Sequence, residues 1–314
     1  MNDRKRIALL LAATAATCAL TRSPAVGLLA GAGCAQFPVV KGGSVVAARV
    51  ASFAMKAAVV ALGFGVQPTT VLQVGAQSAG VTFAGILLVL GLGMVLARLF
   101  GLHRDLGALI ASGTAICGGS AIAAMSPAIG ASRAHTAVSL AVVFLLNGLG
   151  VLLFPLVGSA LRMSPDSFGL WSALAVHDTA GVVGACCAFD PASLATGTVV
   201  KLTRAMWILP VSLVASRVMR GSGKAGVPWF LLGFIAAAFA GEVLPAEVVS
   251  VAAQGARGLM VAALFLLGCG LGREELRSAG VRPMLCGLTL WLGVAGASLA
   301  LIRSGVLSVP LATR

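Results

Sequence analysis

Charged residues are scarce in this sequence. Of its 314 residues only 10% are Asp, Glu, Lys or Arg and 59% are apolar, and the mean hydropathy is +1.04. A soluble domain of this size needs roughly a quarter of its residues charged to cover its surface. Stretches such as Val81 to Ala97 carry no charge at all. This scarcity excludes a water-soluble domain and predicts an all-α polytopic membrane protein with lipid as its solvent and main partner.

The motifs of several other protein classes are also missing. The nucleotide-binding pattern GxxxxGK[ST] is absent, as are GxSxG and HExxH, and the seven cysteines form no CxxC or Cys/His metal spacing. The net charge is +13, but the Lys and Arg residues are not clustered with aromatic residues that could stack on bases. This distribution argues against nucleic acid as a partner. We therefore expect no enzyme, no resident cofactor, no metal and no disulfide framework.

Eleven apolar runs are long enough to be membrane spans, since a bilayer core of about 30 Å needs roughly 20 helical residues. A retained first helix is favoured over a signal peptide. The runs cover approximately residues 7–21, 24–40, 46–66, 79–100, 105–126, 135–160, 167–188, 193–216, 227–244, 249–271 and 284–303.

The distribution of Lys and Arg gives these spans a direction, because cationic loops favour the cytoplasmic side. With eleven crossings, Arg98, Arg104 and Arg162 fall on the cytoplasmic side, whereas Arg133 and Arg303 fall outside. The N-terminus is predicted in the cytoplasm and the C-terminus outside.

The sequence predicts a single transporter domain covering residues 1–314, with broken-helix motifs in its central part, residues 105–216. Two internal similarities suggest repeats within it. Residues 61–65 (ALGFG) resemble residues 266–270 (LLGCG), and a proline opens the span before each. The displacement from span two to span nine is odd, so repeats around 24–100 and 227–303 would be inverted, as in secondary transporters. Residues 114–119 also resemble residues 179–184, but spans five and seven would be parallel. Chance similarity between apolar segments is the alternative.

The fifth span carries a glycine-rich motif, Ser112 to Ala121, that a lipid-facing helix does not need. Consecutive Gly118 and Gly119 weaken a helix by about 1 kcal/mol each relative to Ala, so the backbone can unwind. Unwound backbone is tolerated in a membrane only beside protein or a wet cavity. We therefore predict a broken helix, with close packing through small residues as the alternative. The candidate binding residues here are Thr114, Cys117, Gly118, Gly119 and Ser120.

The seventh span places His177, Asp178 and Thr179 at its centre, where ionisable groups are expensive and usually functional. In the eighth span, Lys201 and Arg204 lie three residues apart on one helix face. The alternative for His177 and Asp178 is a structural pair that fixes helix packing. The alternative for Lys201 and Arg204 is that they snorkel to the membrane surface or only pair with Asp178.

Cations outnumber carboxylates within the spans, which indicates an anionic ligand. Half-helix N-termini beside Gly118 would add amide donors. We hypothesise that a small oxyanion binds among the glycine-rich break, residues 177–179 and Lys201/Arg204. His177 or Asp178 would couple proton movement, with Na⁺ as the other candidate coupling ion.

The ordered motifs GTAICGGSAI (residues 113–122), HDTAGVV (177–183), KLTR (201–204) and VPWFLLG (227–233) resemble the YeiH-type family of bacterial inner-membrane proteins. The family is commonly catalogued as putative sulfate exporters. The resemblance covers about Pro24 to Leu301. It implies a multi-pass fold with inverted repeats and crossing broken helices, like those of bile-acid/sodium symporters and sodium/proton antiporters. Gly65 and Gly181 stand where the family often has Arg and Gln.

The leading prediction is a multi-pass transporter of the bacterial inner membrane. It would be a secondary active transporter that exports or exchanges a small anion such as sulfate, sulfite or a sulfonate, driven by an ion gradient. An anion channel, an intramembrane enzyme and a structural membrane protein are the alternatives. A homo-oligomer is left open.

Overall fold

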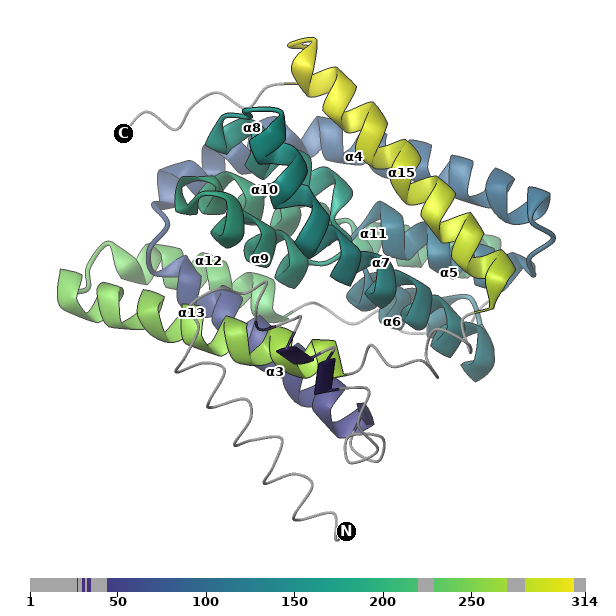
Figure 1. The fold of residues 1–314 in the computed structure, drawn as a ribbon, viewed down its shortest axis with the longest axis horizontal. Helices are drawn as coiled ribbons and strands as arrows, with labels where there is room; N and C mark the ends of the chain where they lie inside the picture. Colours follow the sequence, from purple (N-terminus) through teal and green to yellow (C-terminus); the bar gives the residue numbers. More distant parts are fainter. Residues whose placement is uncertain are drawn as a thin grey trace, which may run out of the picture. The chain divides into compact units, whose positions relative to one another are not determined.

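The computed structural model describes residues 44–219, 229–269 and 280–307, together with Gly27, Ala30, Gly31, Gly33 and Cys34 (Figure 1). Within this part of the chain the secondary structure is helical, with no strand. Five helical segments are long and apolar enough to cross a membrane: Pro68–Leu99, Arg133–Ala160, Pro191–Val218, Ala246–Leu266 and Val281–Arg303. The chain is therefore an all-α polytopic membrane protein, as predicted. The predicted span 7–21 and most of 24–40 lie outside the described residues.

The helices group into two compact units. The first contains the described residues up to Val71, with α3 (Ser44–Gly63), and the two helices α12 (Trp229–Gly241) and α13 (Ala246–Cys269). The second begins at Leu72 and contains most of α4 (Pro68–Leu99) and the nine elements that complete it. These are α5 (Arg104–Ala115), α6 (Gly119–Ala128), α7 (Arg133–Ala160), α8 (Pro165–Ala175), α9 (Thr179–Phe189), η1 (Pro191–Ser193), α10 (Leu194–Met206), α11 (Ile208–Val218) and α15 (Val281–Arg303).

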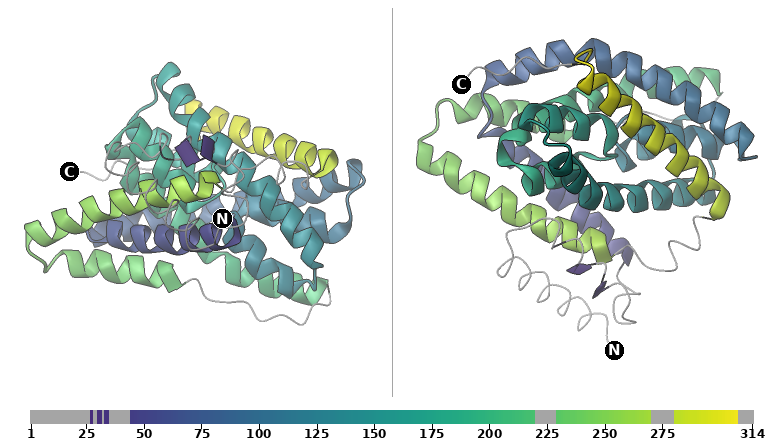
Figure 2. Two further views of the ribbon diagram at one scale, coloured as in Figure 1. Left: turned by 60° about the horizontal axis from the view of Figure 1, so that its bottom comes forward. Right: turned by 45° about the horizontal axis from the view of Figure 1, so that its top comes forward.

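In the first unit, glycines let helices approach backbone to backbone. Figure 2 shows α3 (purple) beside α12 and α13 (light green), and α3 packs against both of them. A Cβ on Gly63 would lie 3.0 Å from the Cβ of Ala237 on α12. Gly27, which is also helical, packs in the same way against α13: a Cβ on it would lie 2.9 Å from the carbonyl oxygen of Val261. These are the close contacts that small residues permit in membranes. The inverted repeat of this region stays a prediction.

In the second unit, α5 and α6 form a hairpin that reverses at Gly118. Placed end to end, helices of 12 and 10 residues would separate their outer ends by about 33 Å. Instead the ring of His103, just before α5, lies 4.8 Å from that of His135 in the first turn of α7. The hydroxyl oxygens of Ser126 on α6 and Thr136 on α7 are 2.6 Å apart. The start of α5, the end of α6 and the start of α7 therefore share one end of the unit.

A second hairpin, α8–α9, reverses at residues 176–178. Phe168 in the first turn of α8 stacks on Phe189, the last residue of α9, at 3.9 Å between ring centroids. The 28 residues of α7 run between the two hairpins. Because α7 crosses the unit, the α5–α6 hairpin opens at one end and the α8–α9 hairpin at the opposite end.

This geometry corrects the predicted topology. The predicted breaks in spans five and seven are present, but neither segment crosses: each returns to the end at which it began. Arg133 therefore lies at the same end as Arg104, not opposite it. Arg162, beyond the far end of α7, lies opposite both and not beside Arg104 as predicted. Spans five and seven, which carry the similar residues 114–119 and 179–184, were predicted to be parallel. Because the α5–α6 segment does not cross and only α7 lies between the two hairpins, the hairpins are inverted relative to one another.

The hairpin topology predicts which positions share a side of the membrane. In a background without native cysteines, Arg104→Cys and Ala134→Cys should react with a membrane-impermeant maleimide from the same side. Ala160→Cys, at the far end of α7, should react only from the other. Comparing right-side-out with inverted vesicles measures this. Opposite labelling of positions 104 and 134 would restore the eleven-crossing topology.

Candidate functional site

The candidate site lies where the two hairpin tips touch. Gly118 has a φ of 63°, a conformation that favours glycine. A Cβ there would lie 3.2 Å from the Cβ of Asp178 and 3.4 Å from the carbonyl oxygen of His177. Beside this contact, the hydroxyl of Thr114 and Nε2 of His177 are 3.3 Å apart, at hydrogen-bond distance. Thr114 and His177 are buried. The sequence thus brings two helix breaks, about 60 residues apart, into direct contact.

Lys201 and Arg204 reach these tips from α10. Both are buried, at 0% and 2% exposure. The ammonium of Lys201 donates to the carbonyl oxygens of Val176 (2.6 Å) and Ala173 (3.3 Å). The guanidinium of Arg204 donates from Nε to the carbonyl of Ala115 and from Nη1 to that of Leu174, with Thr114 accepting from Nη2 at 3.5 Å. Neither side chain snorkels to a membrane surface.

These carbonyls are the free C-terminal ends of α5 and α8. The last carbonyls of a helix have no partner within it and carry the negative end of the helix dipole. Lys201 supplies hydrogen bonds and positive charge at the end of α8, and Arg204 does so at the ends of both α5 and α8. Arg204 therefore joins the two hairpin tips, and Lys201 stabilises the tip of the second hairpin. The sequence did not predict these roles.

The N-terminal ends of the other two half-helices differ. Asp178 caps α9 by accepting a hydrogen bond from the amide of Gly181. The start of α6, at Gly118, has no side-chain cap. Its first-turn residues Gly119 and Ser120 are half-buried. Free amides at a helix N-terminus attract negative charge, so this end of α6 is suited to an anion.

Asn147 of α7 belongs to the same cluster, although the predicted set omits it. Its Oδ1 accepts a hydrogen bond from the amide of Asp178 at 3.1 Å. Its side chain also fills the space beside Gly181, so that a Cβ added to Gly181 would overlap the carboxamide of Asn147. Nδ2 of Asn147 and Nδ1 of His177 are buried without a partner. The sequence feature that could have identified Asn147 is its side-chain amide, which lies between glycine and leucine residues in the predicted span 135–160.

The ten predicted site residues all lie at this junction. Cys117 is buried and close enough to Lys201 and Asp178 for electrostatic interaction. That these ten residues bind a ligand stays a prediction. On the first hairpin they are Thr114, Cys117, Gly118, Gly119 and Ser120; on the second, His177, Asp178 and Thr179; and on α10, Lys201 and Arg204.

These features define a class: a polytopic membrane protein with two opposed re-entrant hairpins around a buried polar centre. The chain belongs to the YeiH-type, UPF0324 membrane-protein family, because the family model described as "Conserved hypothetical protein 698" matches residues 7–287. The resemblance seen in the motifs is thereby confirmed.

Relatives of the chain carry the same designation. The UPF0324 membrane protein of Geobacter sulfurreducens is 44% identical over 262 residues, covering 82% of this chain and 83% of the relative. That of Bdellovibrio bacteriovorus is 43% identical over 256 residues (79% of each chain), and that of Photobacterium profundum is 39% identical over 251 residues (79% and 77%). No solved structure matches the chain.

Removing the Arg204 side chain should destabilise the fold. Arg204→Ala leaves buried carbonyls at two helix ends without donors, at about 1–3 kcal/mol for each. We expect a loss of roughly 3 kcal/mol or more, measured by unfolding in detergent. The exposed Arg217→Ala on α11 is the control, with a change within about 0.5 kcal/mol. Equal stability of the two variants would contradict the role assigned to Arg204.

Proposed function

We propose that this chain is a secondary active transporter that exports or exchanges a small oxyanion such as sulfate, sulfite or a sulfonate. The observation that carries the proposal is the uncapped N-terminus of α6, which lies at the hairpin contact. In a membrane such amides need a partner, and an anion supplies one. No enzymatic step is needed for this role.

The charges around the junction support an anion over a cation. Lys201 and Arg204 stand against the single carboxylate of Asp178, and that carboxylate is engaged in capping α9. A cation site would draw on carboxylates and free carbonyls. Here the carbonyls of Ala173, Leu174 and Val176 already accept from Lys201 or Arg204, and that of Ala175 accepts from the indole of Trp291. Within the predicted set of residues, the start of α6 is therefore our proposed binding position, and Lys201 and Arg204 have a structural role.

The burial of the junction supports a carrier over a channel. Thr114, His177, Lys201 and Arg204 are each at most 3% exposed. A channel needs a continuous wet path, whereas a carrier encloses its site in part of its cycle. This conformation has the closed character of a carrier intermediate.

We also propose that the end at which the α5–α6 hairpin opens faces the cytoplasm. Exposed arginines gather there, since the starts of α5, α7 and α15 and the ends of α4 and α11 meet at it. The opposite end carries Arg162 and Arg303 together with the two carboxylates of Asp166 and Asp190. The excess of cations favours the cytoplasmic side. The five arginines are Arg98, Arg104, Arg133, Arg217 and Arg282.

Filling the start of α6 with a fixed negative charge should abolish anion binding. Ser120→Asp places a carboxylate in the first turn, where it stabilises the helix and competes with a bound anion. Ser120→Asn is the matched neutral control. Thermal shift of the purified protein with sulfate, sulfite and alkyl sulfonates measures binding. An anion at a hundred times its Kd should stabilise the wild type and Ser120→Asn by about 2.7 kcal/mol.

The same anions should leave Ser120→Asp unshifted, and its flux in proteoliposomes should fall at least tenfold (~1.4 kcal/mol). An unchanged response in Ser120→Asp would exclude the start of α6 as the anion site. Stabilisation of the wild type by none of the oxyanions would exclude the proposed substrate class.

Neutralising Asp178 should separate coupling from binding. Asn is also a good N-cap, so Asp178→Asn keeps the cap of α9 while removing a titratable group. Flux driven by a pH gradient should fall at least tenfold (~1.4 kcal/mol), whereas anion exchange without a gradient should persist. Asp190→Asn, at the N-cap of η1, is the control. Proton-driven flux of wild-type size in Asp178→Asn would rule out Asp178 as the coupling group.

A further inference from the structure

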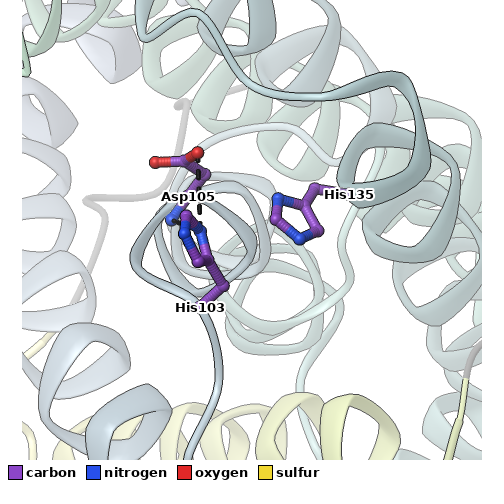
Figure 3. Close-up of side chains that lie close together, drawn as sticks. All are labelled: His103, Asp105 and His135. Carbon is purple, nitrogen blue, oxygen red and sulfur yellow. Dashed lines mark hydrogen bonds and ion pairs between the residues drawn. The ribbon is translucent and has the colours of Figure 1, made fainter.

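A cluster of metal-ligand side chains lies at the open end of the α5–α6 hairpin, away from the junction (Figure 3). It consists of His103, Asp105 and His135, so it holds two of the three histidines of the chain. One ligand atom from each residue lies within 4.8 Å of the others. Nδ1 of His103 is 3.5 Å from Oδ2 of Asp105, and the two imidazole rings stack at 4.8 Å.

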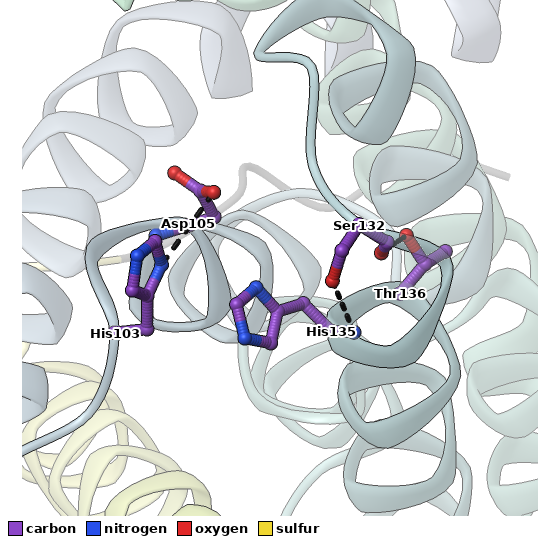
Figure 4. A network of polar contacts seen from close by, with 5 residues as sticks. All are labelled: His103, Asp105, Ser132, His135 and Thr136. Carbon is purple, nitrogen blue, oxygen red and sulfur yellow. Dashed lines mark hydrogen bonds and ion pairs between the residues drawn. The ribbon is translucent and has the colours of Figure 1, made fainter.

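The local backbone holds these side chains in place without using all their ligand atoms. Figure 4 shows that Ser132, not His135, caps α7: the hydroxyl of Ser132 accepts from the amide of His135 at 3.1 Å. The imidazole of His135 is therefore not needed for the cap. Its Nδ1 is buried and has no hydrogen-bond partner. Such an orphaned ring nitrogen indicates a ligand that is not part of the polypeptide.

We propose that His103, Asp105 and His135 bind one divalent transition-metal ion of the Zn²⁺ type. Two ligands about 2.1 Å from a tetrahedral ion lie roughly 3.4 Å apart, so rotation of these side chains is enough to close the cluster around an ion. Three protein ligands leave the fourth position for water. Two imidazoles and one carboxylate are the ligand set of zinc and similar ions.

The same ligand set discriminates against hard cations. Ca²⁺ takes six to eight oxygen ligands and Mg²⁺ about six, whereas this cluster offers a single carboxylate. The neighbouring Arg104 and Arg133 are exposed, so solvent and salt screen their repulsion of an ion. Bonds to imidazole nitrogen do not depend on a surplus of negative charge. The cluster is thus selective for ions that accept nitrogen ligands.

A bound ion would join the start of α5 to the start of α7, because Asp105 lies in the first turn of one helix and His135 in that of the other. The ion would attach the open end of the α5–α6 hairpin to α7, the helix that leads to the α8–α9 hairpin. The site is therefore regulatory or structural, and it is independent of what the hairpin tips bind.

Zinc binding to the detergent-purified full chain tests the proposal, after accessible thiols have been alkylated. Titration against a chromogenic chelator should give one Zn²⁺ per chain. His103→Ala and His135→Ala should each weaken binding at least tenfold, and Asp105→Asn should weaken it less. X-ray absorption of the bound zinc should show nitrogen and oxygen neighbours without sulfur. Mg²⁺ should not compete.

Glu242→Gln, which removes an exposed carboxylate in the first unit, is the matched control and should bind like the wild type. A second readout guards against misfolded variants: Zn²⁺ should raise the melting temperature of the wild type and of Glu242→Gln but not of His135→Ala. Zinc affinity unchanged in both histidine variants, or sulfur in the zinc coordination shell, would overturn the site. Absence of binding to the wild type would do so as well.

Discussion

The structure depends on how two helix breaks are satisfied where water is absent. A carbonyl left without a donor in an apolar surrounding costs about 1–3 kcal/mol, and the C-terminal ends of α5 and α8 present several at one place. Lys201 and Arg204 donate to five of them. The burial of two cations, expensive alone, is offset because the carbonyls and the negative dipole ends surround them. The hairpin tips therefore depend on the donors of α10, and the indole of Trp291 on α15 adds one more at the carbonyl of Ala175.

That arrangement also determines what remains free. Of the four half-helix ends at the junction, the two C-terminal ends accept from the cations of α10, and the start of α9 is capped by Asp178. The start of α6 is left without a side-chain cap. Gly118 matters for the same reason: a side chain there would press on Asp178 and separate the tips. Packing and electrostatics together point to one open position, and its polarity suits an anion.

The sequence predicted the class of protein and the places of the breaks well. Scarcity of charge excludes an aqueous surface, and adjacent Gly118 and Gly119 weaken a helix whatever its surroundings. It could not predict the direction of the chain after each break. Two half-helices of 10 to 12 residues have the combined length of one crossing. Contacts such as the stacking of Phe168 on Phe189 decide between reversal and crossing. The role of Lys201 likewise depended on tertiary placement.

The same reversal explains why the cluster of His103, Asp105 and His135 has no signature in the sequence. Metal motifs are recognised by short spacings on one helix or loop, whereas 32 positions and a complete hairpin separate the two histidines. Counted as a crossing, the α5–α6 segment would place them on opposite sides of the membrane. The reversal at Gly118 brings their rings within 4.8 Å. One backbone conformation at one glycine therefore determines both the contact at the hairpin tips and the ligand cluster at the hairpin base.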